Sequence, residues 1–235
     1  MNTAFQGFSN ETLHFLGQLK RNNRRPWFEK RKKIYEAKVK QPMVELVQAL
    51  NQDLKSYAPE MVTDPKRAVY RIYRDVRFSP DKSPYKTHIA ALFTPQNIPK
   101  HAGGGFYFHL SAEELLVAGG VYMPGPKELL AIRKHIAHDA GLLRRVLANR
   151  RFKECFGTLQ GEQLSRVPKG FPSDHPAADL LRFKQFLVSV AHPPECALDE
   201  DLFQRLTTYF RAMTPLVRFL NKPLMETLRR DLFEF

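Results

Sequence analysis

The chain has 235 residues, of which 43% are hydrophobic and 11% aromatic, enough for a proper core in what we expect to be a single domain. Its net charge of +13 points to an anionic partner, and no stretch approaches the roughly 20 apolar residues of a membrane span. The first eight residues lack an export signal, and Cys155 and Cys196 lie far apart, which argues against a disulfide or cysteine zinc site and favours the cytoplasm.

The first third of the chain is predicted to be helical. Ser9 is suited to cap a helix that runs to about Lys20. Pro26 suits the first turn of a second, strongly basic helix, which Pro42 should kink or restart. The restarted helix is predicted over Met43–Leu54, where apolar residues form a stripe.

A run of strands follows, because the hydrophobic period changes from about 3.6 to about 2 after Ala68. The last two strands of the run are predicted to form a hairpin around Ser111–Glu114. The four predicted strands are Val69–Phe78, Thr87–Phe93, Gly105–Leu110 and Leu115–Tyr122.

The remaining chain is predicted to be mainly helical with one further strand. Pro215 and Pro223 are the expected breaks in its C-terminal helical pair. In chain order the predicted elements are a helix from Pro126 to about His138, a helix over Leu142–Phe152, a loop over Gly157–Pro176, a fifth strand over Arg182–Ala191 and a helical pair that ends in the segment Leu224–Phe235.

Helices, then a run of strands, then helices is the pattern of an α+β fold. We therefore expect a mainly antiparallel sheet of about five strands, covered by N- and C-terminal helices. One domain would span residues 1–235, with a helical part at 1–56, a strand-rich core at 66–123 and a second helical part with one strand at 126–235.

All of the excess positive charge lies in two short windows. Residues 20–40 carry a net charge of +8 and residues 66–86 a net charge of +5, which together account for the whole +13. The rest of the chain is neutral. A basic field confined to part of a surface favours phosphate, nucleic acid or another polyanion.

The second window contains a strand whose two sides differ in character. Alternation predicts an apolar side and a charged side. Arg74 falls on the apolar side and would need an anionic partner there. On the charged side, Asp75 is predicted to bridge toward Arg71 and Arg77. The apolar side comprises Tyr70, Ile72, Val76 and Phe78, and the charged side Arg71, Tyr73, Asp75 and Arg77.

The strand leads into Ser79–Lys86, predicted as a rigid basic loop in which Asp81 and Ser83 bond backbone amides. Arginines, lysines, a tyrosine hydroxyl and orienting carboxylates are the inventory of a phosphate or carboxylate clamp. The alternative is a surface network of ion pairs with a purely structural role. The predicted ligand-binding residues are Arg71, Arg74, Asp75, Arg77, Asp81, Lys82, Tyr85 and Lys86.

The pattern R-x-x-R-D-x-R-F-x-x-D-K-x-x-Y, from Arg71 to Tyr85, resembles the defining motif of an uncharacterised, mainly bacterial family, domain of unknown function 2461. The resemblance extends over essentially the whole length and implies no reaction, cofactor or catalytic residue. Its other matching positions are Asn22-Asn23 with Trp27-Phe28, Gly119-Gly120 with Pro124, and Pro168-Lys169-Gly170 with Asp174-His175-Pro176.

A secondary candidate lies in the long loop, where Asp174 and His175 follow Lys169 and would form an acid or base pair. The alternative is that Asp174 caps a helix start, since His175-Pro176 can begin the short turn Ala177–Leu181. His135 and His138 have a spacing that can bind metal but lack a third ligand, so no metal site is predicted. The sequence identifies no cofactor and no oligomeric state.

The leading hypothesis is a protein that binds a phosphorylated or otherwise anionic ligand at the Arg/Lys cluster, with or without catalysis on it. The first alternative is a nucleic-acid-binding module, because Trp27, Phe28 and Tyr35 interleave with the cations of Lys20–Lys40, unless these aromatics pack inward. The second is a protein-interaction domain with a structural ion-pair motif. No membrane partner is expected.

Overall fold

The structure, a computed structural model, describes the backbone of residues 7–99 and 101–233 and the side chains up to residue 226. Most of the eight residues on which the export prediction rests, and the end of the predicted segment Leu224–Phe235, lie outside this description. None of the described helices has the length and apolar character needed to cross a membrane.

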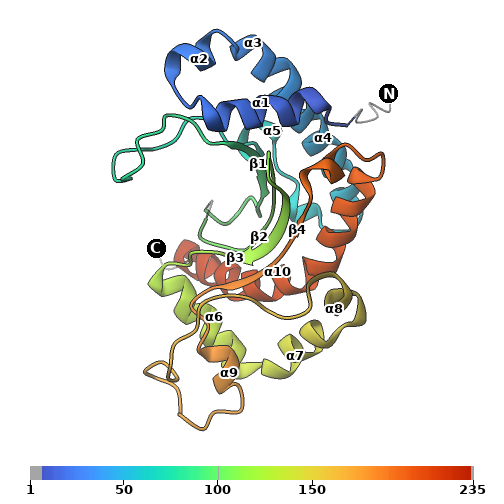
Figure 1. Ribbon diagram of the computed structural model, residues 1–235. Helices are drawn as coiled ribbons and strands as arrows, with labels where there is room; N and C mark the ends of the chain where they lie inside the picture. The colour runs from blue at the N-terminus through green and yellow to red at the C-terminus, as the bar shows by residue number, and fades with distance from the viewer. Residues whose placement is uncertain (1–6, 100, 234–235) are drawn as a thin grey trace. The chain divides into compact units, whose positions relative to one another are not determined.

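The fold is α+β, with four strands in an antiparallel sheet of order β1-β2-β3-β4 (Figure 1). Four of the five predicted strands are confirmed, and β2 and β3 form the predicted hairpin, in which Ser111 N donates to Glu114 O at 2.9 Å. The strands are β1 (His88–Phe93), β2 (Gly105–Ser111), β3 (Leu115–Val121) and β4 (Phe186–His192).

Residue contacts divide the chain into two compact units. Each unit draws on three stretches of sequence, so that β2, β3 and β4 each contribute residues to both. A single domain over residues 1–235 stays a prediction. Unit 1 comprises Met1–Phe93, Tyr107–Val117 and Ala191–Thr207, and unit 2 comprises Thr94–Phe106, Ala118–Val190 and Thr208–Phe235.

Unit 1 contains the predicted N-terminal helices. Ser9 precedes α1, and its backbone N–H donates to Thr12 Oγ1 at 3.2 Å, which confirms the predicted cap position. Pro42 lies in the first turn of α4, so the helix restarts there after a π-helical turn. The elements are α1 (Asn10–Arg21), α2 (Arg25–Glu29), α3 (Lys32–Tyr35), the π-helix η1 (Glu36–Lys40), α4 (Gln41–Tyr57), the 3₁₀ turn η2 (Pro59–Met61), α5 (Pro65–Ala68) and the 3₁₀ turn η3 (Pro194–Ala197).

The described part of unit 2 contains four helices and most of a fifth. The Phe106 and Phe210 rings stack with centroids 4.9 Å apart, and the buried Asn221 side chain bonds both backbone groups of Gly104. The helices are α6 (Pro126–His138), α7 (Ala140–Ala148), α8 (Arg150–Phe156), α9 (Ala178–Leu181) and α10 (Leu202–Phe233), whose first residues belong to unit 1.

Two predictions place the interruptions of helices wrongly. The predicted C-terminal pair is one helix, α10, with Pro215 and Pro223 inside it. The predicted helix Leu142–Phe152 is divided at Asn149, whose side chain accepts a hydrogen bond from Phe152 N at 3.3 Å and so starts α8. An asparagine that can cap a new helix competes with helix continuation.

The predicted strand Val69–Phe78 is also wrong. This segment makes only isolated antiparallel bridges, from Val69 to Ala91 and from Tyr73 to Tyr85. Beyond Tyr73 the local side chains replace a strand partner, because Asp75 Oδ1 accepts a hydrogen bond from Arg77 N at 3.2 Å. The alternating pattern therefore overstates the strand, and Phe78, predicted on the apolar side, is 93% exposed.

Candidate functional site

The base of the Arg71–Tyr85 motif is fixed to the turn between α1 and α2. Asn23 Nδ2 donates to Tyr85 O at 2.8 Å, and Tyr85 N donates to Asn23 Oδ1 at 3.1 Å, so one amide satisfies both backbone groups of Tyr85. Arg74 N and Lys86 N donate to backbone carbonyls of the facing segment. The two ends of the motif are thereby held side by side.

Tyr85 is part of an aromatic cluster in unit 1. Its ring stacks on Phe28 with centroids 4.2 Å apart and is 1% exposed. Burial raises the pKa of the Tyr85 hydroxyl, with Glu29 adding to the effect. The predicted hydrogen bond from Tyr85 to a ligand stays a prediction, and in this structure the ring serves as packing. The cluster comprises Phe15, Trp27, Phe28, Tyr35, Tyr73 and Tyr85.

The aromatic side chains of the basic helical region, residues 20–40, belong to this cluster. Phe28 and Tyr35 are buried at 1% and 4% exposure, in α2 and α3. The Arg31 guanidinium lies 4.6 Å above the Trp27 ring. Phe28 and Tyr35 therefore pack inward, as in the inward alternative, and one cation, Arg31, lies over Trp27, while Ile34 is 47% exposed.

The middle of the motif projects as a loop, drawn in blue-green in Figure 1. Arg74 pairs with Asp81, which supplies the anionic partner that its position required. Arg77 pairs with Asp75 through Nη2 and Oδ2 at 2.7 Å, whereas Arg71 acts on Asp75 only as a nearby charge. The predicted bridge from Asp75 to both arginines is therefore present on one side only.

The loop's carboxylates are held in their ionised form. Hydrogen bonds from Arg77 lower the pKa of Asp75 to about 2. Hydrogen bonds from Ser83, with a further one from Arg74, lower the pKa of Asp81 to about 2. Ser83 N donates to Asp81 Oδ1 at 2.8 Å, as predicted, and Lys82 Nζ donates to Val76 O at 3.0 Å. Most of the loop's charge is thus engaged within the loop.

Arg71 differs from the other arginines of the motif. It is exposed, and its guanidinium makes no hydrogen bond or ion pair with any described residue. Lys86 Nζ donates to the Arg71 carbonyl at 3.2 Å and lies 4.8 Å above the centre of the Tyr70 ring. Burial raises the pKa of Tyr70 to about 12. Lys86 is therefore held against the backbone of Arg71, and both residues supply a cation at the base of the motif.

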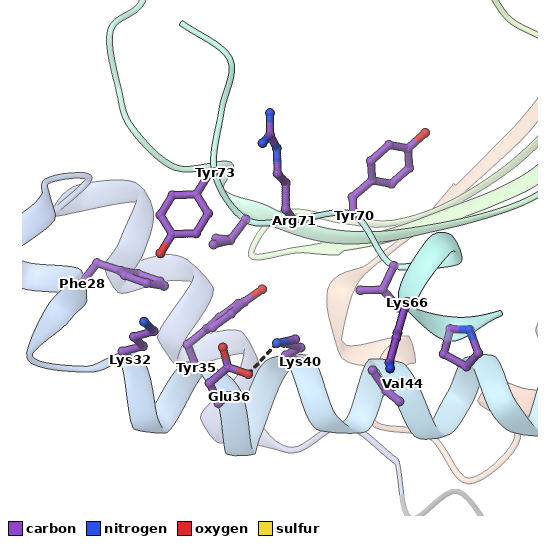
Figure 2. Close-up of a pocket in the computed structure, with 13 residues that line it drawn as sticks. Phe28, Lys32, Tyr35, Glu36, Lys40, Val44, Lys66, Tyr70, Arg71 and Tyr73 are labelled. Atoms are coloured by element: carbon purple, nitrogen blue, oxygen red, sulfur yellow. Dashed lines mark hydrogen bonds and ion pairs between the residues drawn. The ribbon is translucent and has the colours of Figure 1, made fainter. Parts of the chain in front are cut away.

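A cavity of about 360 Å³ lies between α3, η1 and α4 on one side and residues 65–73, which include Arg71, on the other (Figure 2). Both basic windows contribute to its lining, with Lys32 and Lys40 from the first and Lys66 from the second. Figure 2 shows Arg71 and Tyr70 pointing away from the helices, so only their bases line this cavity. Their polar ends share the opposite side of the segment.

A polar cluster that the sequence analysis did not single out lies on β1 and β2. The His88 and His109 rings are 4.9 Å apart, and the Tyr70 and Tyr107 rings meet edge to face at 6.4 Å. Tyr107 Oη and His109 Nδ1 are 3.1 Å apart, and His109 Nε2 and Glu114 Oε1 are 3.2 Å apart. The signal was available, because Tyr107 and His109 are two residues apart on a predicted strand and so share one side.

The secondary candidates Lys169, Asp174 and His175 lie in unit 2. His175 Nδ1 accepts a hydrogen bond from Ala177 N at 3.0 Å, at the start of α9. The capping alternative assigns the cap to Asp174, whereas this bond is made by His175, so both the capping role of Asp174 and the acid or base pair stay predictions. Within the described residues, no group of three His, Cys, Asp or Glu side chains is placed to hold a metal ion.

Comparisons with known proteins identify the family. No curated protein and no solved structure matches the chain. The model of the family described as "Conserved hypothetical protein (DUF2461)" matches residues 11–219, which include the motif, its Asn23 anchor and the polar cluster on β1 and β2. The chain therefore belongs to this family, as the motif Arg71–Tyr85 predicted.

Proposed function

We propose that unit 1 binds a phosphate-bearing or otherwise anionic ligand at Arg71 and Lys86. The observation that carries this proposal is the exposed Arg71 guanidinium, which pairs with no carboxylate among the described side chains although two other arginines of the same motif do. A guanidinium can bind two oxygens of one phosphate or carboxylate, and an ammonium adds a point charge beside it.

The paired residues of the loop have a supporting role in this proposal. Arg74 with Asp81 and Arg77 with Asp75 stiffen the loop and leave its net charge positive, since Lys82 adds a further cation. The cations that line the cavity, Lys32 on the side of α3 and Lys66 on the opposite side, extend the same positive field. The field attracts an anion, and Arg71 orients it.

Binding of inorganic phosphate and pyrophosphate, measured by calorimetry at low and at physiological salt, tests the proposal. Arg71→Ala should weaken binding about tenfold or more, because a charge-assisted hydrogen bond is worth about 1.5–3 kcal/mol. Arg150→Ala is the matched control, since it removes the same charge from a 92% exposed side chain in unit 2. Equal affinities in wild type and Arg71→Ala would contradict the proposal.

A nucleic-acid-binding module is the second candidate, favoured by one feature of the projecting loop. Phe78 is 93% exposed, and the Arg77 guanidinium lies 5.8 Å from the centre of its ring. An exposed aromatic beside a cation can stack on an unpaired base. This function requires oligonucleotide binding that falls steeply with salt and weakens in Phe78→Ala. Oligonucleotide binding of this kind, with no Arg71-dependent phosphate binding, would favour it over the first.

The proposed location is the cytoplasm, because Cys155 and Cys196 are both free thiols in this structure, in different units.

The third hypothesis, a protein-interaction domain with a structural motif, predicts that Arg71→Ala unfolds the protein. Arg71 is exposed and contributes no side-chain hydrogen bond, so we expect its variant to fold.

A further inference from the structure

Tyr107, His109 and Glu114 form a chain of hydrogen bonds in unit 1. Glu114 as a carboxylate can only accept, so His109 Nε2 carries a proton and donates a hydrogen bond to Glu114 Oε1, at 3.2 Å. His109 Nδ1 is then unprotonated and accepts the phenol proton of Tyr107, at 3.1 Å. A hydroxyl, a base within hydrogen-bond distance and a third group that orients the base are the structural signature of an activated nucleophile.

The turn between β2 and β3 fixes the third group of this chain. Glu114 N donates to Ser111 Oγ at 3.0 Å, and Ser111 N donates to Glu114 O at 2.9 Å. The Glu114 side chain is 41% exposed while that of His109 is 13% exposed. The base is therefore shielded and held by a carboxylate whose backbone is tied to the hairpin.

The surroundings keep His109 in the form that a base requires. Burial lowers its pKa, and the nearby carboxylate of Glu114 opposes this effect. Burial, with His109 and Lys86 as neighbouring groups, lowers the pKa of His88 to about 4. Both imidazoles are neutral at neutral pH.

The hydrogen-bonded chain adjoins the cations proposed to bind the ligand. Lys86 Nζ lies 4.8 Å above the Tyr70 ring, which meets the Tyr107 ring edge to face at 6.4 Å. Figure 2 shows Arg71 directed to the same side of its segment as Tyr70. Lys86 also acts on His88 as a nearby charge, and the His88 ring lies 4.9 Å from the His109 ring, so Lys86 neighbours the hydrogen-bonded chain through both Tyr70 and His88.

We propose that Tyr107 is a nucleophile toward a phosphate monoester bound at Arg71 and Lys86, with His109 as its base. This inference rests on the proposed anion binding. Tyr107 Oη bonds to phosphorus while its proton passes to His109 Nδ1, the ester P–O bond breaks, and the leaving oxygen takes that proton. Water then attacks phosphorus and the P–Oη bond breaks, while His109 carries a proton from the water to the tyrosine oxygen. The net reaction consumes ester and water and gives an alcohol and phosphate.

The activity test uses 4-nitrophenyl phosphate and three variants of the full chain. Wild type should release 4-nitrophenolate and, after rapid quenching, show a phosphoryl group on Tyr107 by peptide mass spectrometry. Tyr107→Phe keeps the ring and should lose both signals, and His109→Gln should slow release about 10²–10⁴-fold. Tyr122→Phe, at a 66% exposed tyrosine, is the matched control and should behave as wild type.

Glu114 is a positioning residue, so its variant is tested by the pH profile of the rate. Because Glu114 raises the pKa of His109, Glu114→Gln should move the acidic limb of the profile to lower pH. A purely structural role would lower the rate without moving this limb. An unmoved limb would overturn the assignment of Glu114.

The outcomes separate this inference from the proposed function. Arg71-dependent binding of inorganic phosphate, with neither 4-nitrophenolate release nor phosphorylated Tyr107, overturns the nucleophile and leaves anion binding in place. Release that is unchanged in Tyr107→Phe also overturns it. Absence of both phosphate binding and release overturns both proposals. Release of 4-nitrophenolate that depends on Tyr107 and persists in Arg71→Ala supports Tyr107 as the nucleophile and means that the phosphate ester does not bind at Arg71.

Discussion

Tyr85 and Phe78 belong to the same motif, yet 1% of Tyr85 and 93% of Phe78 is exposed. Tyr85 lies at the base of the motif, where Asn23 binds its backbone and Phe28 stacks on its ring. Phe78 lies in the projecting loop, where the hydrogen bonds and ion pairs of the charged side chains run within the loop itself. One sequence pattern thus contains a buried, anchored base and an exposed outer loop with internal ion pairs.

The largest expected effect comes from truncating the buried aromatic. Tyr85→Ala should lower the free energy of unfolding by about 3–5 kcal/mol, because it removes a ring from a packed cluster. Phe78→Ala, at the exposed ring, should change it by no more than about 0.5 kcal/mol. Urea unfolding followed by circular dichroism measures both. Similar losses in the two variants would show that base and loop are not distinct.

The anchor itself is tested by Asn23→Ala. The substitution leaves Tyr85 N and O without their side-chain partner, at a half-buried position. We expect a loss of about 1–3 kcal/mol in the free energy of unfolding. Asn149→Ala, which removes a helix cap in unit 2, is a comparison that leaves the motif untouched. Faster amide exchange at Tyr85 and Lys86 in Asn23→Ala alone is the expected local result.

The half-buried His88, next to His109, gives a pH-dependent prediction. The pKa of His88 is about 4 in the folded state, below the roughly 6.5 of an unfolded chain. Between about pH 6.5 and 4, His88 is therefore protonated in the unfolded state and neutral in the folded state. The free energy of unfolding falls as pH drops through this range. The groups around the ring are His109 and Lys86, with Glu114 beyond His109.

His88→Gln should reduce the loss of unfolding free energy between about pH 6.5 and 4 by roughly 1–2 kcal/mol, a range that allows for the part of the ring that solvent screens. The measurement is the urea midpoint at several pH values between about 4 and 7. His109 shares the direction of shift, so the variant should retain part of the slope. A slope identical to wild type would mean that His88 is not the group that titrates.

Much of the secondary structure was predictable from local patterns. Ser9, Pro42 and the alternating strands of the hairpin carry their signals in neighbouring residues, and these predictions are confirmed. The motif was recognisable as well, but its geometry was not. Asp75 turns back onto Arg77 N, and this local bond outweighs the alternation that suggested a strand.

The pairing of distant residues was beyond the sequence pattern. Asn23 and Tyr85 are 62 positions apart, and nothing local indicates that one side chain will bind the other's backbone. His88, Tyr107 and Glu114 come from two strands and a turn, so only the register of the sheet brings them together. Arg71 was named as a site residue, but its lack of a carboxylate partner became visible only once Asp75 and Asp81 were assigned to other arginines.

The smallest expected effect is in the outer loop, at Asp81. Its pKa of about 2 lies below the roughly 3.9 of an unfolded chain, so its stabilising contribution is present above about pH 4 and is lost as pH falls toward 2. Because the side chain is 57% exposed, Asp81→Asn should leave the unfolding midpoint at pH 7 almost unchanged. The loop should respond instead, since Arg74 loses its ion pair and the amide of Ser83 loses a charged acceptor. We expect faster protease cleavage between Arg74 and Ser83 in Asp81→Asn than in wild type, with Tyr85 still protected. Cleavage at the wild-type rate would show that the ion pair does not hold the loop, and the contrast with the anchored base would then rest on exposure alone.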